Sequence, residues 1–210
     1  MTKIKICGVT LADDAARASA AGADFVGINF WPKSKRFVEL SRARMLADAV
    51  RAAGNARVVG VFVDATVEQI AEVHARVELD IVQLHGDETP AHADALARTL
   101  HRPIWKAVPA TALDAVAAWS VDAVLLDTPT PDRGGSGEVF DWALAREARR
   151  RYPTHAFVLA GGLGPDNVAR AVAEVAPWAV DVASGVESAP GVKDASKLTA
   201  FVSAVRVALV

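Results

Sequence analysis

The chain has 210 residues, of which 52% are hydrophobic and 23% charged, and its formal net charge is −2. This composition is typical of a folded globular protein and excludes a disordered or collagen-like chain. The small charge and the lack of a run of Lys and Arg argue against a nucleic-acid partner, and no apolar stretch reaches the roughly 20 residues that span a membrane.

The ends of the chain and its cysteine content set further expectations. Cys7 is the only cysteine, so no internal disulfide can form and a reducing cytoplasm is expected. A strand begins almost at Met1, so no signal peptide is expected. Because there is no linker or change in composition, we expect one domain over residues 1–210. No long apolar loop or patch is visible, which favours a monomer, although a homodimer stays open.

Short apolar segments alternate with helical segments along the whole chain. The apolar segments are typical of buried parallel strands and cover residues 3–7, 25–29, 57–63, 81–84, 104–107 and 123–126, followed by runs that begin at Phe157 and Ala179. Helices are predicted over residues 11–20, 41–54, 66–77, 89–100, 112–119, 142–152 and 196–209. Thr10 and Ser41 are the expected caps of the first two helices, and Gly22 is expected to stop the first.

This alternation of strand and helix predicts a parallel sheet covered by helices. A closed barrel and an open, doubly wound sheet both fit the pattern. Eight complete units favour the barrel, because an open sheet of eight strands would leave two edges to protect. We therefore predict a single (β/α)8 TIM barrel of the α/β class, although such barrels typically have about 250 residues.

Two glycine-containing turns follow the last two predicted strands. Gly161-Gly162 and Ser184-Gly185 offer backbone that can approach a ligand closely. In an eight-fold barrel the loops after strands seven and eight are the usual phosphate site, where backbone N–H groups at a helix N-terminus bind the anion. The two turns together predict a site for a phosphorylated small molecule.

Polar side chains at the other strand ends mark the expected active-site face. They are Cys7, Asn29, Arg36, Asp64, Gln83, His85, Lys106, Asp127 and Asp181. Cys7 and Asp127 are a thiol and a carboxyl that could act as base and acid on one sugar-sized substrate. A thiol with a pKa of about 8.5 is mostly protonated at neutral pH and an aspartate with a pKa of about 3.9 is ionised. Each group would therefore need its pKa shifted by its surroundings.

The same residues also have structural interpretations. A single cysteine that ends a buried strand is often a small core residue, and an aspartate after a strand often caps a helix or forms a turn. His85 is equally consistent with a loop hydrogen bond, and Lys106 with an ion pair inside the barrel. Glu187 is expected to start a short helix after Ser184-Gly185-Val186. Five scattered histidines and one cysteine predict no metal site.

Seven linked motifs resemble the phosphoribosylanthranilate isomerase family. They are Lys5-Ile6-Cys7-Gly8, residues 27–36, residues 82–88, Leu126-Asp127-Thr128 with residues 134–137 and 140–142, residues 159–163, residues 181–187, and residues 190–194. The resemblance covers essentially the whole chain. Seven motifs in the expected order are far more specific than any one of them.

The resemblance implies a barrel that catalyses an Amadori rearrangement in tryptophan biosynthesis, without cofactor or metal. The substrate would be N-(5-phosphoribosyl)anthranilate, a phosphorylated aminoaldose, and the product 1-(2-carboxyphenylamino)-1-deoxyribulose 5-phosphate. The resemblance makes Asp127 the general acid that opens the ribose ring and Cys7 the general base that takes the C2′ proton. It makes Arg36 the ligand of the anthranilate carboxylate, and Asp181 a contact of the sugar or of its own loop. The implied phosphate ligands are Gly135, Ser136, Gly137, Gly161, Gly162, Ser184 and Gly185.

Two other functions stay open at this stage. A related isomerase of histidine biosynthesis would use the same fold, but the first strand of those barrels ends in Asp, whereas Cys7 stands here. A non-catalytic barrel that binds a phosphorylated ligand would make Cys7 and Asp127 structural. Replacing either residue would then leave ligand affinity unchanged.

Overall fold

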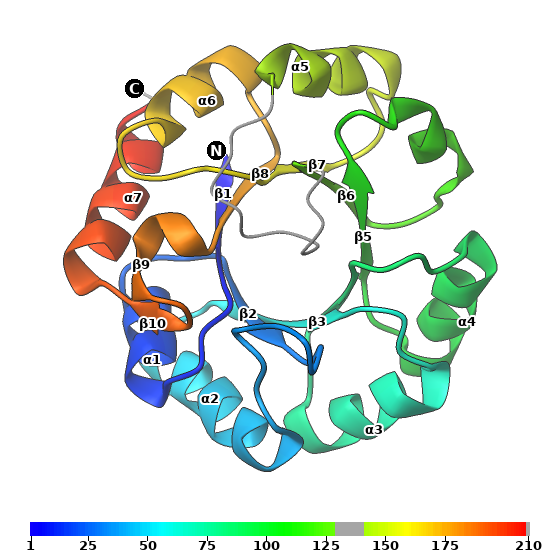
Figure 1. Cartoon of the computed structure of the whole chain (residues 1–210), viewed down its shortest axis with the longest axis vertical. Coiled ribbons are helices and arrows are strands. Elements are labelled where there is room, and N and C mark those ends of the chain that lie inside the picture. The colour runs from blue at the N-terminus through cyan, green and yellow to red at the C-terminus, as the bar shows by residue number, and fades with distance from the viewer. Residues whose placement is uncertain (129–140, 209–210) are drawn as a thin grey trace.

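The computed structural model describes residues 1–128 and 141–208. Within them, eight parallel strands pair in sequence order and β8 pairs with β1, so the sheet closes into a barrel. The strands are β1 (Lys3–Cys7), β2 (Phe25–Asn29), β3 (Arg57–Phe62), β4 (Ile81–Leu84), β5 (Ile104–Pro109), β6 (Ala123–Asp127), β7 (Phe157–Leu159) and β8 (Ala179–Val182). Figure 1 looks down this barrel, and the helices form a ring around it. The predicted TIM barrel is confirmed.

Helices connect successive strands. They are α1 (Ala12–Ala20), α2 (Leu40–Ala53), α3 (Val67–Val77), α4 (Pro90–Leu100), η1 (Leu113–Ala118), α5 (Trp142–Arg151), α6 (Val168–Val175) and α7 (Ala195–Val207). The segment η1 lies where a short helix is predicted, but it is a 3₁₀ helix. Between β8 and α7 lie a 3₁₀ turn, η2 (Ser184–Val186), and a hairpin of β9 (Glu187–Ala189) and β10 (Val192–Lys193). The sequence pattern does not predict this hairpin, because its strands are too short to show periodicity.

Two of the predicted helix caps are wrong. Leu11 precedes α1, which has no side-chain cap. The Thr10 hydroxyl instead donates to the carbonyl of Gly191 at 2.7 Å and ties the loop after β1 to the hairpin turn. Helix α2 begins at Leu40, one residue before the expected cap Ser41. Gly22, with a φ of 95°, follows the end of α1 as predicted.

Alternate residues along each strand enter two separate apolar cores. Ile4 and Ile6 of β1 belong to the layer between strands and helices, whereas Phe25 and Trp105 belong to a smaller cluster inside the barrel. Lys5 shares the inward face of β1 and is fully buried. The interior therefore changes from apolar to charged toward the carboxyl ends of the strands. No helix among the described residues is long and apolar enough to cross a membrane.

Three aspartates repeat one contact at the amino-terminal end of the barrel. Each stands immediately before an even-numbered strand, and its carboxylate accepts a hydrogen bond from a backbone N–H of the preceding strand. The pairs are Asp24 with Ile4 (2.9 Å), Asp80 with Val58 (2.8 Å) and Asp122 with Ile104 (2.8 Å). These three contacts, here called the aspartate clamps, join neighbouring strands on the face opposite the strand ends that carry the site.

Candidate active site

A cavity of about 940 Å³ lies at the carboxyl ends of the strands. Ligand cavities in proteins typically measure about 300–1,000 Å³. The walls come from several strand ends, the loop after β2 and the β9–β10 hairpin. The cavity brings together most of the site residues expected from the sequence: Cys7, Asn29, Arg36, Gln83, His85, Asp127, Gly161, Gly162, Asp181 and Ser184.

Asp127 ends β6 and is held through both carboxylate oxygens. Oδ1 accepts a hydrogen bond from the N–H of Thr128 at 2.8 Å, and Oδ2 lies 3.3 Å from Nε2 of His85. On the other side of this ring, Nε2 of Gln83 lies 3.0 Å from Nδ1 of His85. When the Gln83 amide donates, Nδ1 is an acceptor and the ring proton sits on Nε2, facing Asp127. In that tautomer the ring N–H points at the carboxylate.

Gly161 brings the loop after β7 against Asp127. Its φ is 83°, in the left-handed region that side chains disfavour. A Cβ at this position would clash with the hydroxyl of Thr128 and lie 3.1 Å from Oδ1 of Asp127. Glycine is therefore required here both for the backbone conformation and for the close approach.

Cys7 ends β1 above a buried ion pair. Nζ of Lys5, which is fully buried, lies 3.0 Å from Oδ1 of Asp181 on the neighbouring strand β8. Burial raises the pKa of the Cys7 thiol, and the Lys5 ammonium, which lowers it, offsets only part of the rise. Burial also acts to lower the pKa of Lys5, but Asp181 and Cys7 outweigh it and hold that pKa above its ordinary value. Lys5 is therefore a charged ammonium inside the barrel.

Arg36 reaches the cavity from the loop after β2 and is bound by Glu187. Its Nε and Nη2 donate to the two oxygens of Glu187 at 2.8 and 2.7 Å, and this bond raises the pKa of Arg36. Burial acts to raise the pKa of Glu187, but Arg36 and Lys193 hold it below its ordinary value. The prediction that Glu187 starts a short helix is wrong, because η2 ends at Val186 and Glu187 begins β9. Two cations face one carboxylate, so the cluster keeps a net positive charge.

Lys193 lies at the centre of this cluster, although no role for it is predicted from the sequence. Its buried ammonium donates to the carbonyls of Cys7 at 2.6 Å and Ala183 at 3.2 Å, and to Glu187 at 2.8 Å. It thereby joins the ends of β1 and β8 to the hairpin. In the sequence, Lys193 is marked only by its place in the motif at residues 190–194. Nothing in the local sequence indicates these long-range contacts.

The sequence leaves two roles open for Lys106, in the active site or in an ion pair inside the barrel. In the structure it forms an ion pair. Its Nζ lies 2.7 Å from Oε2 of Glu88 and both side chains are buried. Among the described residues that line the cavity, Lys106 does not appear. Nor do residues 1–128 and 141–208 contain a group of three or more His, Cys, Asp or Glu side chains that could hold a metal ion.

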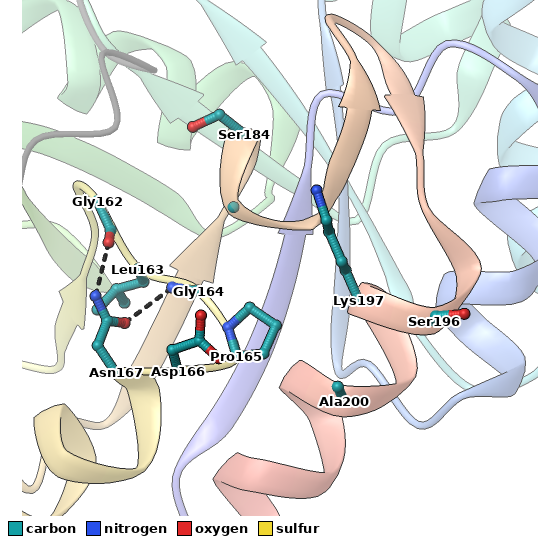
Figure 2. Close-up of a pocket in the computed structure, with 11 residues that line it drawn as sticks. Gly162, Leu163, Gly164, Pro165, Asp166, Asn167, Ser184, Ser196, Lys197 and Ala200 are labelled. Atoms are coloured by element: carbon teal, nitrogen blue, oxygen red, sulfur yellow. Dashed lines mark hydrogen bonds between the residues drawn. The ribbon is translucent and has the colours of Figure 1, made fainter.

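A second cavity, of about 730 Å³, adjoins the first at Gly162, Leu163 and Ser184. Figure 2 shows it between the loop after β7 and the first turn of α7. Asn167 fastens the loop, since its Oδ1 accepts from the N–H of Gly164 and its Nδ2 donates to the carbonyl of Gly162, both at 2.9 Å. A Cβ on Gly185 would clash with the Leu163 carbonyl. The loops after β7 and β8 therefore pack tightly where phosphate binding is expected. The other expected phosphate ligands, Gly135, Ser136 and Gly137, lie outside the described residues.

A closed (β/α)8 barrel with a thiol, a carboxyl and a guanidinium at the carboxyl ends of its strands has the architecture of a barrel enzyme. The family model for N-(5'phosphoribosyl)anthranilate (PRA) isomerase matches residues 4–204. The N-(5'-phosphoribosyl)anthranilate isomerase of Trichlorobacter lovleyi is 43% identical over 213 residues, covering 100% of both chains. The chain belongs to the phosphoribosylanthranilate isomerase family, whose members are isomerases of tryptophan biosynthesis.

Solved structures are similar over the same length. One, of monomers made from the dimeric phosphoribosylanthranilate isomerase of Thermotoga maritima, has 37% identity and a TM-score of 0.85, covering 99% of this chain and 100% of that one. Another phosphoribosylanthranilate isomerase, in complex with reduced 1-(o-carboxyphenylamino)-1-deoxyribulose 5-phosphate, has 36% identity and a TM-score of 0.83, with the same coverage.

Proposed function

We propose that the chain converts N-(5-phosphoribosyl)anthranilate to 1-(2-carboxyphenylamino)-1-deoxyribulose 5-phosphate, with Asp127 as general acid and Cys7 as general base. The observation that carries the proposal is that both groups line one cavity in a barrel of this family. The reaction shifts hydrogen and double bonds within one molecule. It therefore needs proton transfer and no external oxidant or reductant.

The first step is the opening of the ribose ring. Asp127, in its protonated form, donates to the ring oxygen while the nitrogen lone pair forms a C1′=N bond and the C1′–O bond breaks. The contact of 3.3 Å between Asp127 and His85 supports this role, because a partner this close keeps the carboxyl group oriented for proton transfer. The second carboxylate oxygen is held by Thr128, which keeps the acid in place.

The second step is the removal of the C2′ proton. The Cys7 thiolate takes this proton, the C–H electrons form a C1′=C2′ double bond, and the C=N electrons return to nitrogen. The resulting enolamine tautomerises to the ketone. The position of Cys7 in the cavity supports this role, although burial favours the protonated thiol. The Cys7 thiol therefore needs a neighbouring group that favours its conversion to the thiolate.

The substrate would lie between two anion sites. With Nε and Nη2 of Arg36 on Glu187, the anthranilate carboxylate would meet the remaining Nη1 side of the guanidinium. The 5′-phosphate would lie on the backbone at Gly161, Gly162, Ser184 and Gly185. Asp181 would face the sugar from β8. The two anchors would then hold C2′ near Cys7 and the ring oxygen near Asp127.

Parallel steady-state turnover of two substrates tests this proposal against its nearest rival. One is N-(5-phosphoribosyl)anthranilate and the other is the aminoaldose of histidine biosynthesis. We expect turnover of the first, because Arg36 offers a partner to its carboxylate and β1 ends in Cys7 rather than Asp. Turnover of the histidine-pathway substrate alone would overturn the proposal.

We also propose that residues 1–210 work as one catalytic domain in the cytoplasm. The site joins β1 to the hairpin near the other end of the chain, so neither half contains it. A thiol base must stay reduced, which a cytoplasm ensures. We keep the monomer as the expected form, with a homodimer as the alternative, since the relative from T. maritima is named dimeric.

A further inference from the structure

The reaction steps above make no use of Lys5, a fully buried cation directly below the site. Lys5 and Cys7 stand two residues apart on β1, so their side chains leave the same face of the strand. In the strand register Lys5 pairs with Asp181 of β8 and Cys7 pairs with Gly27 of β2. The three ionisable groups therefore lie in one corner of the barrel interior.

Gly27 shows how closely the thiol and the lysine approach. A Cβ on Gly27 would lie 2.8 Å from Sγ of Cys7 and 3.3 Å from Cε of Lys5. Sγ and Cε are therefore at most about 6 Å apart, because both lie that close to one point. Because Gly27 has no side chain, the end of Lys5 and the thiol of Cys7 can approach each other beside β2. An opposite charge within about 4–6 Å strongly favours the ionised form of a group.

We propose that Lys5 is a positioning residue that supplies the counter-charge for the Cys7 thiolate, and that Asp181 competes with the thiolate for this charge. The proposal rests on the role of Cys7 as general base. An anion without a partner is costly in a buried site. The ammonium of Lys5 compensates this cost without touching the substrate, so the thiol can release its proton in a closed cavity.

Other charged groups line the same cavity or contact the end of β1. They are Asp181 on β8, Lys33, Lys35 and Arg36 after β2, Glu187 on β9, Lys193 on β10, Asp127 at the end of β6 and His85 after β4. Arg36 and Lys193 both pair with Glu187, and His85 lies against Asp127. Of the cations that lower the pKa of Cys7, Lys5 acts more strongly than Lys193. Lys5 is thus the cation best placed to stabilise the thiolate.

The single cysteine makes the proposal directly measurable. The rate of alkylation by iodoacetamide, followed by mass spectrometry against pH, reports only on Cys7. We expect Lys5→Met to raise the midpoint of this titration by about 1–3 pH units, because a nearby positive charge is lost. We expect Asp181→Asn to lower the midpoint by about 1 pH unit, because a nearby negative charge is lost. A general loosening of the site would expose the thiol and lower both midpoints.

Lys3→Met is the matched control, since Lys3 has the same side chain on the same face of β1, at its opposite end. Its midpoint should equal that of the wild type. If Lys5→Met does not fold, the double variant Lys5→Met/Asp181→Asn removes both charges and leaves the interior neutral. Its midpoint should still exceed that of the wild type, because Lys5 affects the thiol more strongly than Asp181 does. An unchanged or lowered midpoint in Lys5→Met, or in the double variant, would overturn the proposal.

The pH profile of kcat/KM separates this proposal from the proposed function. The acid limb should move upward in Lys5→Met together with the alkylation midpoint, because only the thiolate accepts the C2′ proton. If the midpoint moves but Cys7→Ala retains activity, the proposed function fails while the charge effect of Lys5 stands. If Cys7→Ala is inactive and the midpoint does not move, only the role of Lys5 fails.

Discussion

The guanidinium of Arg36 is held in place before any ligand arrives. Its two bonds to Glu187, which Lys193 supports from the other side, restrict a side chain that is otherwise flexible. A group that is already ordered loses less conformational entropy when it binds. The residue therefore offers a fixed and still positively charged edge to an incoming carboxylate.

Arg36→Met tests this role at the scale of one residue. We expect KM for N-(5-phosphoribosyl)anthranilate to rise by about 10- to 100-fold with little change in kcat, since a hydrogen bond between charged groups contributes about 1.5–3 kcal/mol. Steady-state kinetics measures both constants. Arg44→Met, an exposed position on α2, is the control and should leave KM unchanged. A fall in kcat at constant KM would instead mean that Arg36 acts only in the transition state.

At the scale of the elements, the aspartate clamps hold neighbouring strands together at the amino-terminal end of the barrel. Each connects a residue just before one strand to the backbone of the strand before it. The contacts satisfy backbone N–H groups near the strand starts, where an unpaired group would cost free energy. In this fold, residues on that face serve stability, whereas the opposite face carries the chemistry.

Asp80→Ala should therefore lower stability without lowering activity. The loss of one partly buried hydrogen bond costs about 1 kcal/mol, which corresponds to a fall in Tm of about 2–4 °C for a chain of this length. Thermal unfolding by circular dichroism measures it. Asp94→Ala, on the exposed face of α4, is the matched control. An unaltered Tm, or a reduced kcat, would show that the clamp does not have this role.

Sequence patterns predict elements well where the signal is local. The short, mostly apolar segment of β4 predicts its bounds correctly, and Thr66 and Gln69 form a capping box at the start of α3, where a helix is predicted. Thr10 fails as a cap because its partner, Gly191, lies far along the chain. The aspartates of the clamps precede strands visibly in the sequence, but nothing local indicates what they bind.

The candidate site also contains residues that the sequence predicts and contacts that it does not. Cys7 and Asp127 can be proposed from the sequence because strand ends of a barrel meet at one face. The bond between Arg36 and Glu187 joins residues 151 positions apart and depends on a hairpin that has no periodic pattern. The burial of Lys5 is similarly hidden, since a lysine in a strand ordinarily indicates an exposed face.

At the scale of the whole molecule, closure of the barrel makes the site from distant parts of the chain. Strand β8 pairs with β1, which places Asp181 beside Lys5 and the hairpin over Cys7. Strand β6 contributes Asp127 from further around the ring. In Figure 1 the first and last strands lie side by side. The acid, the base and the expected anion sites thus share one cavity only in the closed barrel.

The kcat of Cys7→Ala and Asp127→Asn, measured beside the wild type on N-(5-phosphoribosyl)anthranilate, tests the central claim most directly. Circular dichroism of each variant first establishes that the barrel is intact. We expect kcat to fall by at least about 10² in each, the usual contribution of a general acid or base. Wild-type values of kcat in either folded variant would contradict the account and leave the barrel without the proposed acid or base.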